Sequence, residues 1–239
     1  MGNFLQSVHL RFTDEAAADA ALTTICRGTK LRLWVSPVRN GWLTVFPNRF
    51  EGFMHVCRHA SRTLGCTAVG TMVHDSDVFC YSVCVDGRED DEFASTPEYF
   101  RQARKAERLR AVGNPEKIRH LLAVPDGWER LLRLYAQRLV LDPENQMQEM
   151  LVLLGIPDGL SSYEHLEAGE RSGVSDWSRY RHIPDLAAEK EANRKQQADI
   201  KAQKIQLRKD GLLVDEIKFE AFKGEQFFPF AGDPRRGGS

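Results

Sequence analysis

The chain has 239 residues, which is enough for one large domain or two modest ones. Hydrophobic residues make up 42% of it and charged residues 28%, close to the values of folded globular proteins, so neither a disordered nor a fibrous protein is expected. Its 33 basic and 34 acidic side chains leave a formal charge of −1, which removes any global electrostatic attraction to nucleic acid or anionic membranes.

The targeting signals and the cysteines of the sequence indicate in which cellular compartment the protein is expected. The first residues lack a basic stretch followed by an apolar core, and no later segment approaches the roughly 18 apolar residues that a membrane span needs. The five cysteines lie within apolar segments and include no CxxC pair, so we expect reduced, mostly buried thiols in a reducing compartment. These features predict a cytoplasmic protein that does not enter a membrane.

A strand, a helix and a hairpin are predicted at the start of the chain. Apolar and polar residues alternate over residues 3–12, as in a half-buried strand, and an Ala-rich helix follows up to about Cys26. The apolar segments on either side of Asn40-Gly41 predict a hairpin, because this dipeptide tolerates the positive φ angles of a tight turn.

A second helix and three more strands are predicted next. Residues 51–64 carry apolar side chains at helical spacing, and Gly65 is placed to end that helix. Strands are predicted within 66–74, 78–85 and 88–93. The order β-α-β-β-α-β-β-β is similar to a split βαβ arrangement. The expected fold class is therefore α+β, with a mainly antiparallel sheet and two helices on one of its faces.

The composition changes after this sheet module, which we place at residues 1–97. A helical region is expected at 98–185, where apolar residues recur at helical spacing between breaks at Gly and Pro. Residues 186–239 form the third part. It consists of a long, charged helix followed by an aromatic carboxy-terminal tail at 219–230.

The tetrad His74-Asp75-Ser76-Asp77 lies between two predicted strands and concentrates polar groups. If His74, Asp75 and Asp77 converge, they offer a metal site or an acid-base pair, because Asp prefers hard cations and His titrates near neutral pH. The alternative is a turn in which the polar side chains bond to their own backbone and the acids remain in water. These three residues are the catalytic candidates, and no cofactor is expected.

His55 and His59 are the second metal candidates. They lie one helical turn apart, a spacing at which two imidazoles can bind zinc. Val56 stands where the metalloprotease motif requires Glu, and no third ligand is visible. The neighbouring Arg58 and Arg62 favour an exposed basic face over a metal site.

Two oppositely charged segments are candidate contacts with a partner. The acidic segment consists of Glu89, Asp90, Asp91 and Glu92. It either protects an edge strand from unwanted pairing or attracts a basic partner. The basic segment includes Arg101, Arg104 and Arg108. It lacks interleaved aromatic residues for base stacking, so its support for nucleic-acid binding is weak.

Three hypotheses of function follow from these residues. The chain contains no nucleophile elbow, Walker-type phosphate loop or dinucleotide fingerprint. The leading hypothesis is therefore an intracellular binding or regulatory protein that acts through protein–protein contacts rather than through catalytic turnover. A bacterial immunity or defence-associated partner is an example, although no residue indicates that context. The competing hypothesis is a metal-dependent hydrolase that uses His74, Asp75 and Asp77, and the third is a nucleic-acid-binding regulator.

Overall fold

The computed structural model describes most of the first 184 residues and part of a helix beyond them. The described ranges are 4–97, 99, 111–136, 142–171, 174–184, 191, 194–195, 197–202 and 205. Contacts divide the chain into two units, Met1–Leu186 and Ala187–Ser239. The three-part division expected from composition stays a prediction. The described residues of the second unit are helical, and the aromatic tail at 219–230 lies outside the described residues.

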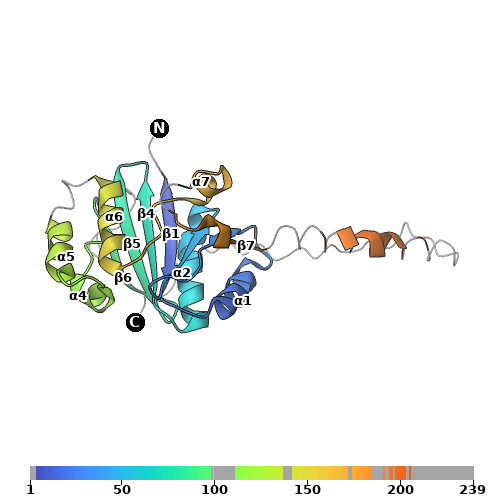
Figure 1. Cartoon of the computed structure of the whole chain (residues 1–239), viewed down its shortest axis with the longest axis horizontal. Coiled ribbons are helices and arrows are strands. Elements are labelled where there is room, and N and C mark those ends of the chain that lie inside the picture. Colours follow the sequence, from blue (N-terminus) through green and yellow to red (C-terminus); the bar gives the residue numbers. More distant parts are fainter. Residues whose placement is uncertain are drawn as a thin grey trace, which may run out of the picture. The chain divides into compact units, whose positions relative to one another are not determined.

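Among the described residues, seven strands form one antiparallel sheet in the order β6-β5-β4-β1-β3-β2-β7 (Figure 1). The strands are β1 (Leu5–Leu10), β2 (Leu33–Val35), β3 (Leu43–Pro47), β4 (Ala68–His74), β5 (Val78–Val85), β6 (Arg88–Ala94) and β7 (Arg181–Ile183). Two β-α-β units interleave, because β3 lies between β1 and β2 while β1 lies between β3 and β4. The predicted α+β class, with a split βαβ-like antiparallel sheet, is confirmed.

Helices cover both faces of this sheet. They are α1 (Glu15–Cys26), α2 (Phe50–Leu64), α4 (Pro115–Ile118), α5 (Gly127–Ala136), α6 (Pro143–Leu154) and α7 (Tyr163–Glu167), with 3-10 turns at Arg119–Leu121 and Trp177–Arg179. The predicted pair, α1 and α2, packs on one face, and α5 and α6 pack on the other. In Figure 1, α6 lies beside β4 and β5. Within the described ranges, no helix is long and apolar enough to span a membrane.

The central strand β1 shows how the two faces are filled. Val8 and Leu10 belong to the apolar cluster of α1 and α2, whereas Leu5 belongs to the cluster of α5 and α6. Because side chains alternate along a strand, Ser7 and His9 lie on the same face as Leu5. All residues of β1 are buried, so these two polar side chains need hydrogen-bond partners inside the protein.

Local sequence signals place the turns. Asn40 and Gly41 have φ angles of 51° and 78°, the left-handed conformation expected for the tight turn between β2 and β3. This predicted hairpin is confirmed by the pairing of Trp34 with Phe46. Gly65 has a φ of 58° and ends α2 as expected, because a left-handed residue lets its N–H bond back to the last helical turn.

The strand β7 is the element that the sequence pattern does not predict, since its residues fall within the region expected to be helical. It pairs with β2, with Leu33 opposite Ile183 and Val35 opposite Arg181. A strand of three residues is too short to show a recognisable alternation of apolar and polar positions. Its existence depends on the edge that β2 offers, and not on a local signal.

Candidate functional site

The predicted His74-Asp75-Ser76-Asp77 tetrad forms the turn between β4 and β5. Asp75 and Ser76 have φ angles of 54° and 56°, and the backbone N–H of Asp77 donates to the carbonyl oxygen of His74 over 3.0 Å. This is the backbone geometry of a tight turn. The hydroxyl of Ser76 donates to Oε1 of Glu144 on α6 over 2.7 Å, so the turn is tied to the helical layer.

His74 and Asp77 share Tyr99 as a partner. Nδ1 of His74 lies 3.2 Å from Oη of Tyr99, which in turn donates to Oδ2 of Asp77 over 3.4 Å. Loss of solvation and the carboxylates of Asp77 and Asp75 raise the pKa of Tyr99, so its hydroxyl keeps its proton. Phe4 packs edge-on against His74, with 4.8 Å between ring centroids.

No group of three or more His, Cys, Asp or Glu side chains within the described ranges is arranged to hold a metal ion. His55 and His59 do lie together on α2, with ring centroids 4.3 Å apart. Burial lowers the pKa of His55, and the neighbouring His59 lowers it to a smaller extent, so the neutral imidazole is favoured. The metal roles of this pair, and the catalytic roles of His74, Asp75 and Asp77, stay predictions.

The predicted acidic segment lies on β6, an edge strand of the sheet. Glu89 forms an ion pair with Arg58 over 3.1 Å, and Asp90 forms one with Lys117 over 3.3 Å. Glu89 and Asp90 are therefore compensated within the chain. The predicted basic contacts Arg101, Arg104 and Arg108 lie outside the described residues.

Asp91, the third acidic residue, points into the protein. Its carboxylate accepts hydrogen bonds from Oη of Tyr81 over 2.7 Å and from the backbone N–H of Asn114 over 3.0 Å. Burial raises the pKa of Asp91. Tyr81 also bonds to Oη of Tyr135 on α5, so this carboxylate connects β6 to the helical layer. Partner binding by the acidic segment as a whole, with Glu92 included, stays a prediction.

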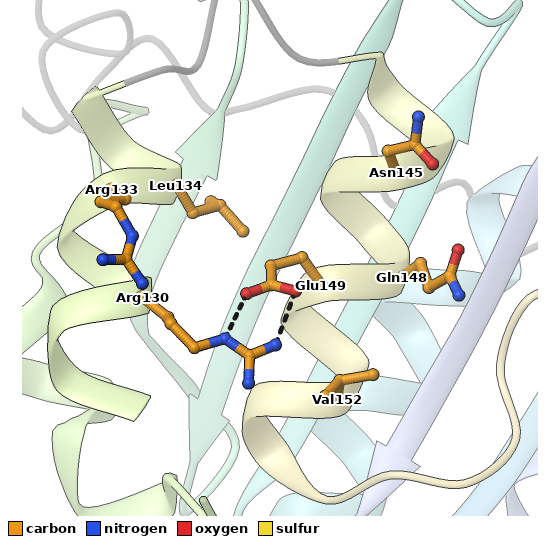
Figure 2. A pocket seen from close by; sticks show the side chains of 7 residues that line it. All are labelled: Arg130, Arg133, Leu134, Asn145, Gln148, Glu149 and Val152. Atoms are coloured by element: carbon orange, nitrogen blue, oxygen red, sulfur yellow. Dashed lines mark hydrogen bonds and ion pairs between the residues drawn. The ribbon is translucent and has the colours of Figure 1, made fainter. Parts of the chain in front are cut away.

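A groove that no sequence motif marks lies between α5 and α6 (Figure 2). Its cavity volume is about 350 Å³. The side chains that line it are Arg130, Arg133, Leu134, Asn145, Gln148, Glu149 and Val152. On each helix the lining residues follow one another at spacings of three or four residues, with one adjacent pair on each helix, so each wall is one side of a helix surface. Five of these seven residues are polar or charged, and Leu134 and Val152 are aliphatic.

Arg130 and Glu149 join the two walls of the groove. Nε and Nη2 of Arg130 donate to Oε1 and Oε2 of Glu149, both over 2.8 Å, in the bidentate pair shown in Figure 2. Nη1 of Arg130 also lies 3.6 Å from Oδ1 of Asp126. Hydrogen bonding to Glu149 raises the pKa of Arg130. The guanidinium is therefore held by two carboxylates, and each oxygen of Glu149 accepts a hydrogen bond from it.

Arg133 lies one helical turn from Arg130 on the α5 side of the groove. Among the residues that the structure describes, it forms no ion pair or hydrogen bond, and its side chain is exposed. Figure 2 shows the amides of Asn145 and Gln148 on the α6 side, pointing away from α5. The groove thus offers the guanidinium of Arg133, which is paired with no described residue, whereas these two amides lie toward the outer side of α6.

A second feature that the sequence analysis did not anticipate is a polar network buried on the face of the sheet covered by α5 and α6. Nδ1 of His9 lies 3.1 Å from Oγ1 of Thr44, and Nε2 lies 3.0 Å from Oγ1 of Thr71 and 3.0 Å from Oγ of Ser7. These side chains come from the adjacent strands β1, β3 and β4. All four are buried, so this arrangement is closed to solvent.

The loop at 156–162 covers this network. Thr44 donates its hydroxyl hydrogen to the carbonyl oxygen of Asp158 over 3.1 Å, and Ser7 donates to that of Gly159 over 3.2 Å. Thr44 must then accept from Nδ1–H of His9, which assigns the neutral tautomer with a bare Nε2. Burial lowers the pKa of His9 to about 3, in agreement with a neutral ring.

Comparisons of the chain with protein-family models, with curated proteins and with solved structures give no significant match. The only sequence signal for the groove is the set of polar positions on two amphipathic helices. Ordinary solvent-exposed helix surfaces carry the same signal.

Proposed function

We propose that this protein is a binding module that acts through contacts with another protein, and that the α5–α6 groove is its contact surface. The observation that carries the proposal is the composition of the groove, which two packed helices line with guanidinium and aliphatic side chains. Arg is enriched at protein interfaces because its head binds polar groups while its stem covers apolar surface.

The aliphatic residues of the two helices support this proposal. Val152, which lines the groove, is 43% exposed, and Leu132, on another side of α5, is 42% exposed. Apolar side chains among polar ones are the usual anatomy of an interface, and a groove between two helices is a recurrent docking site for a peptide segment. A partner that covered Val152 would remove this apolar surface from water.

The chemistry of the lining side chains favours recognition over turnover. Guanidinium and amide groups do not change protonation near neutral pH, so they offer neither a general base nor a general acid. The carboxylate of Glu149 is engaged by Arg130 through both of its oxygens. What the groove offers a ligand is charge, hydrogen-bond donors and apolar contact.

Site-specific photo-crosslinking tests the proposal. A photoreactive residue in place of Gln148, in the full chain expressed in cells of its source, should give protein adducts that Arg133→Glu abolishes. The same residue in place of Thr23, exposed on α1 at the opposite face of the sheet, is the matched control and should give none of these adducts. Equal adducts from both positions, or none from position 148, would contradict the proposal.

A further inference from the structure

The charges of the groove indicate which kind of partner it accepts, an inference that rests on the proposed binding function. Two of the lining residues, Arg130 and Arg133, are positive, and Glu149 is negative. Arg130 is compensated, because it binds Glu149 through two hydrogen bonds and also contacts Asp126. Among the described residues, no side chain forms an ion pair with the guanidinium of Arg133.

The ion pair between Arg130 and Glu149 disfavours a basic partner. A lysine or arginine side chain that entered the groove would need a carboxylate as its acceptor, and Glu149 is the one carboxylate among the lining residues. Both oxygens of Glu149 already accept from Arg130 at 2.8 Å. A basic partner would have to break this bidentate pair and place its own charge next to two guanidinium groups, which is unfavourable.

An acidic partner meets the opposite situation. The guanidinium of Arg133 presents several N–H donors in a plane, a geometry that matches the two oxygens of a carboxylate. Arg133 is exposed, so its donors are accessible without the loss of a bond to any described residue. The new ion pair would therefore replace no ion pair between residues that the structure describes.

We infer that the groove binds a protein segment that places an Asp or Glu side chain on Arg133 and an aliphatic side chain against Val152. Asn145 and Gln148 also line the α6 side, but their amides point away from α5, so Arg133 and Val152 provide the contacts to that segment. The exposed Val152 argues for a peptide over a small free carboxylate, because it offers an apolar contact that such a ligand would leave unused. Charge complementarity thus sets the kind of partner, and the apolar contact adds to its affinity.

Selection from a displayed library of random peptides on the full chain tests this inference. The selected peptides should combine Asp or Glu with aliphatic residues, and Arg133→Glu should weaken their binding by about tenfold or more. Arg27→Glu makes the same change of charge at an exposed position just after α1 and is the matched control, which should retain binding. Replacement of the acidic peptide residue by Lys should restore binding to the Arg133→Glu protein, a charge-swap rescue that a purely structural effect could not produce.

The outcomes separate this inference from the proposed function. Groove-dependent peptides that are not acidic, or that bind the wild-type and Arg133→Glu proteins equally, would overturn the carboxylate assignment. In that case partner adducts from position 148 would still support the binding function. Binding of glutarate alone that Arg133→Glu abolishes, with no peptide selected, would show a small-molecule site and overturn the peptide assignment. No groove-dependent peptide together with no adduct from position 148 would overturn both.

Discussion

The two faces of β1 are closed in different ways. Toward α1 and α2, Val8 and Leu10 belong to a cluster of apolar side chains. Toward the 156–162 loop, Ser7 and His9 are closed by hydrogen bonds. Apolar packing depends on volume, whereas a buried imidazole depends on staying neutral and on the geometry of its partners. Apolar packing stabilises one face of β1 and buried hydrogen bonds stabilise the other. Different perturbations should therefore weaken the two contributions.

The largest loss of unfolding free energy is expected from a substitution on the apolar face of β1, toward α1 and α2. Leu10 is fully buried, so Leu10→Ala removes apolar contacts and leaves a cavity that should lower the free energy of unfolding by about 2–5 kcal/mol. Urea denaturation measures this change. Leu132→Ala removes the same atoms from a side chain that is 42% exposed, and its effect should be much smaller. Equal losses for the two variants would show that Leu10 does not carry the packing assigned to it.

The pH dependence of the free energy of unfolding should come from the polar face of β1, which carries His9. Burial lowers the pKa of His9 from 6.5 to about 3. Between these two pH values, His9 is protonated in the unfolded chain but stays neutral in the folded protein. The contribution of the neutral His9 to the free energy of unfolding is complete above pH 6.5. As the pH falls from 6.5 toward 3, this contribution decreases by about 1.4 kcal/mol per pH unit.

Urea denaturation of the wild type and of His9→Gln over this pH range isolates that contribution, because the carboxylates titrate in both proteins. The difference in unfolding free energy between the two should shrink as the pH falls, since Gln cannot take up a proton. A parallel pH dependence in the two proteins would rule out the assigned role of His9.

The loop over His9 should tolerate little added volume. A Cβ at Gly159 would lie 2.8 Å from Cε1 of His9 and 2.9 Å from Cδ1 of Leu151, so Gly159→Ala should destabilise the fold by about 1–3 kcal/mol. Ser161→Ala is the control in the same loop. Its buried hydroxyl has no hydrogen-bond partner among the described residues, so its removal should be neutral or stabilising. Similar melting temperatures for both variants would mean that the loop is not packed tightly on His9.

The smallest effect on stability is expected at the groove. Glu149→Gln removes one charge from a partly exposed ion pair, which contributes little to folding, so its melting temperature should stay close to that of the wild type. The same change leaves two guanidinium groups less compensated, and acidic peptides should bind more tightly at low salt. Calorimetric titration measures that affinity. Weaker binding would indicate that Glu149 itself contacts the peptide.

Much of the fold could be predicted because its signals are local. Asn40-Gly41 specifies a turn through the φ angles that these two residues tolerate, and the apolar spacing of residues 51–64 indicates α2 and its buried side. The strand β7 could not be predicted in the same way. Its three residues become a strand only by pairing with β2, which lies far away in the sequence.

The candidate site was less accessible from the sequence than the fold. The alternation of Ser7, Val8 and His9 is the same whether the polar face meets water or a second layer, so only the covering loop reveals that His9 is buried. Arg133 and Gln148 likewise resemble ordinary solvent-exposed helix residues until the two helices are placed side by side. The His74-Asp75-Ser76-Asp77 tetrad was conspicuous in composition, yet its backbone is that of a turn.

The pairing of β7 with β2 also has a consequence for the chain as it leaves the ribosome. Residues 33–35 emerge early, but their partners at 181–183 are made only after the intervening helices. Until then the outer edge of β2 has no strand to receive its N–H and C=O groups, and an open edge is a template for association between chains. Such a late, long-range pairing also raises the contact order and should slow folding. We therefore expect translation to the end of β7 to protect newly made chains from aggregation.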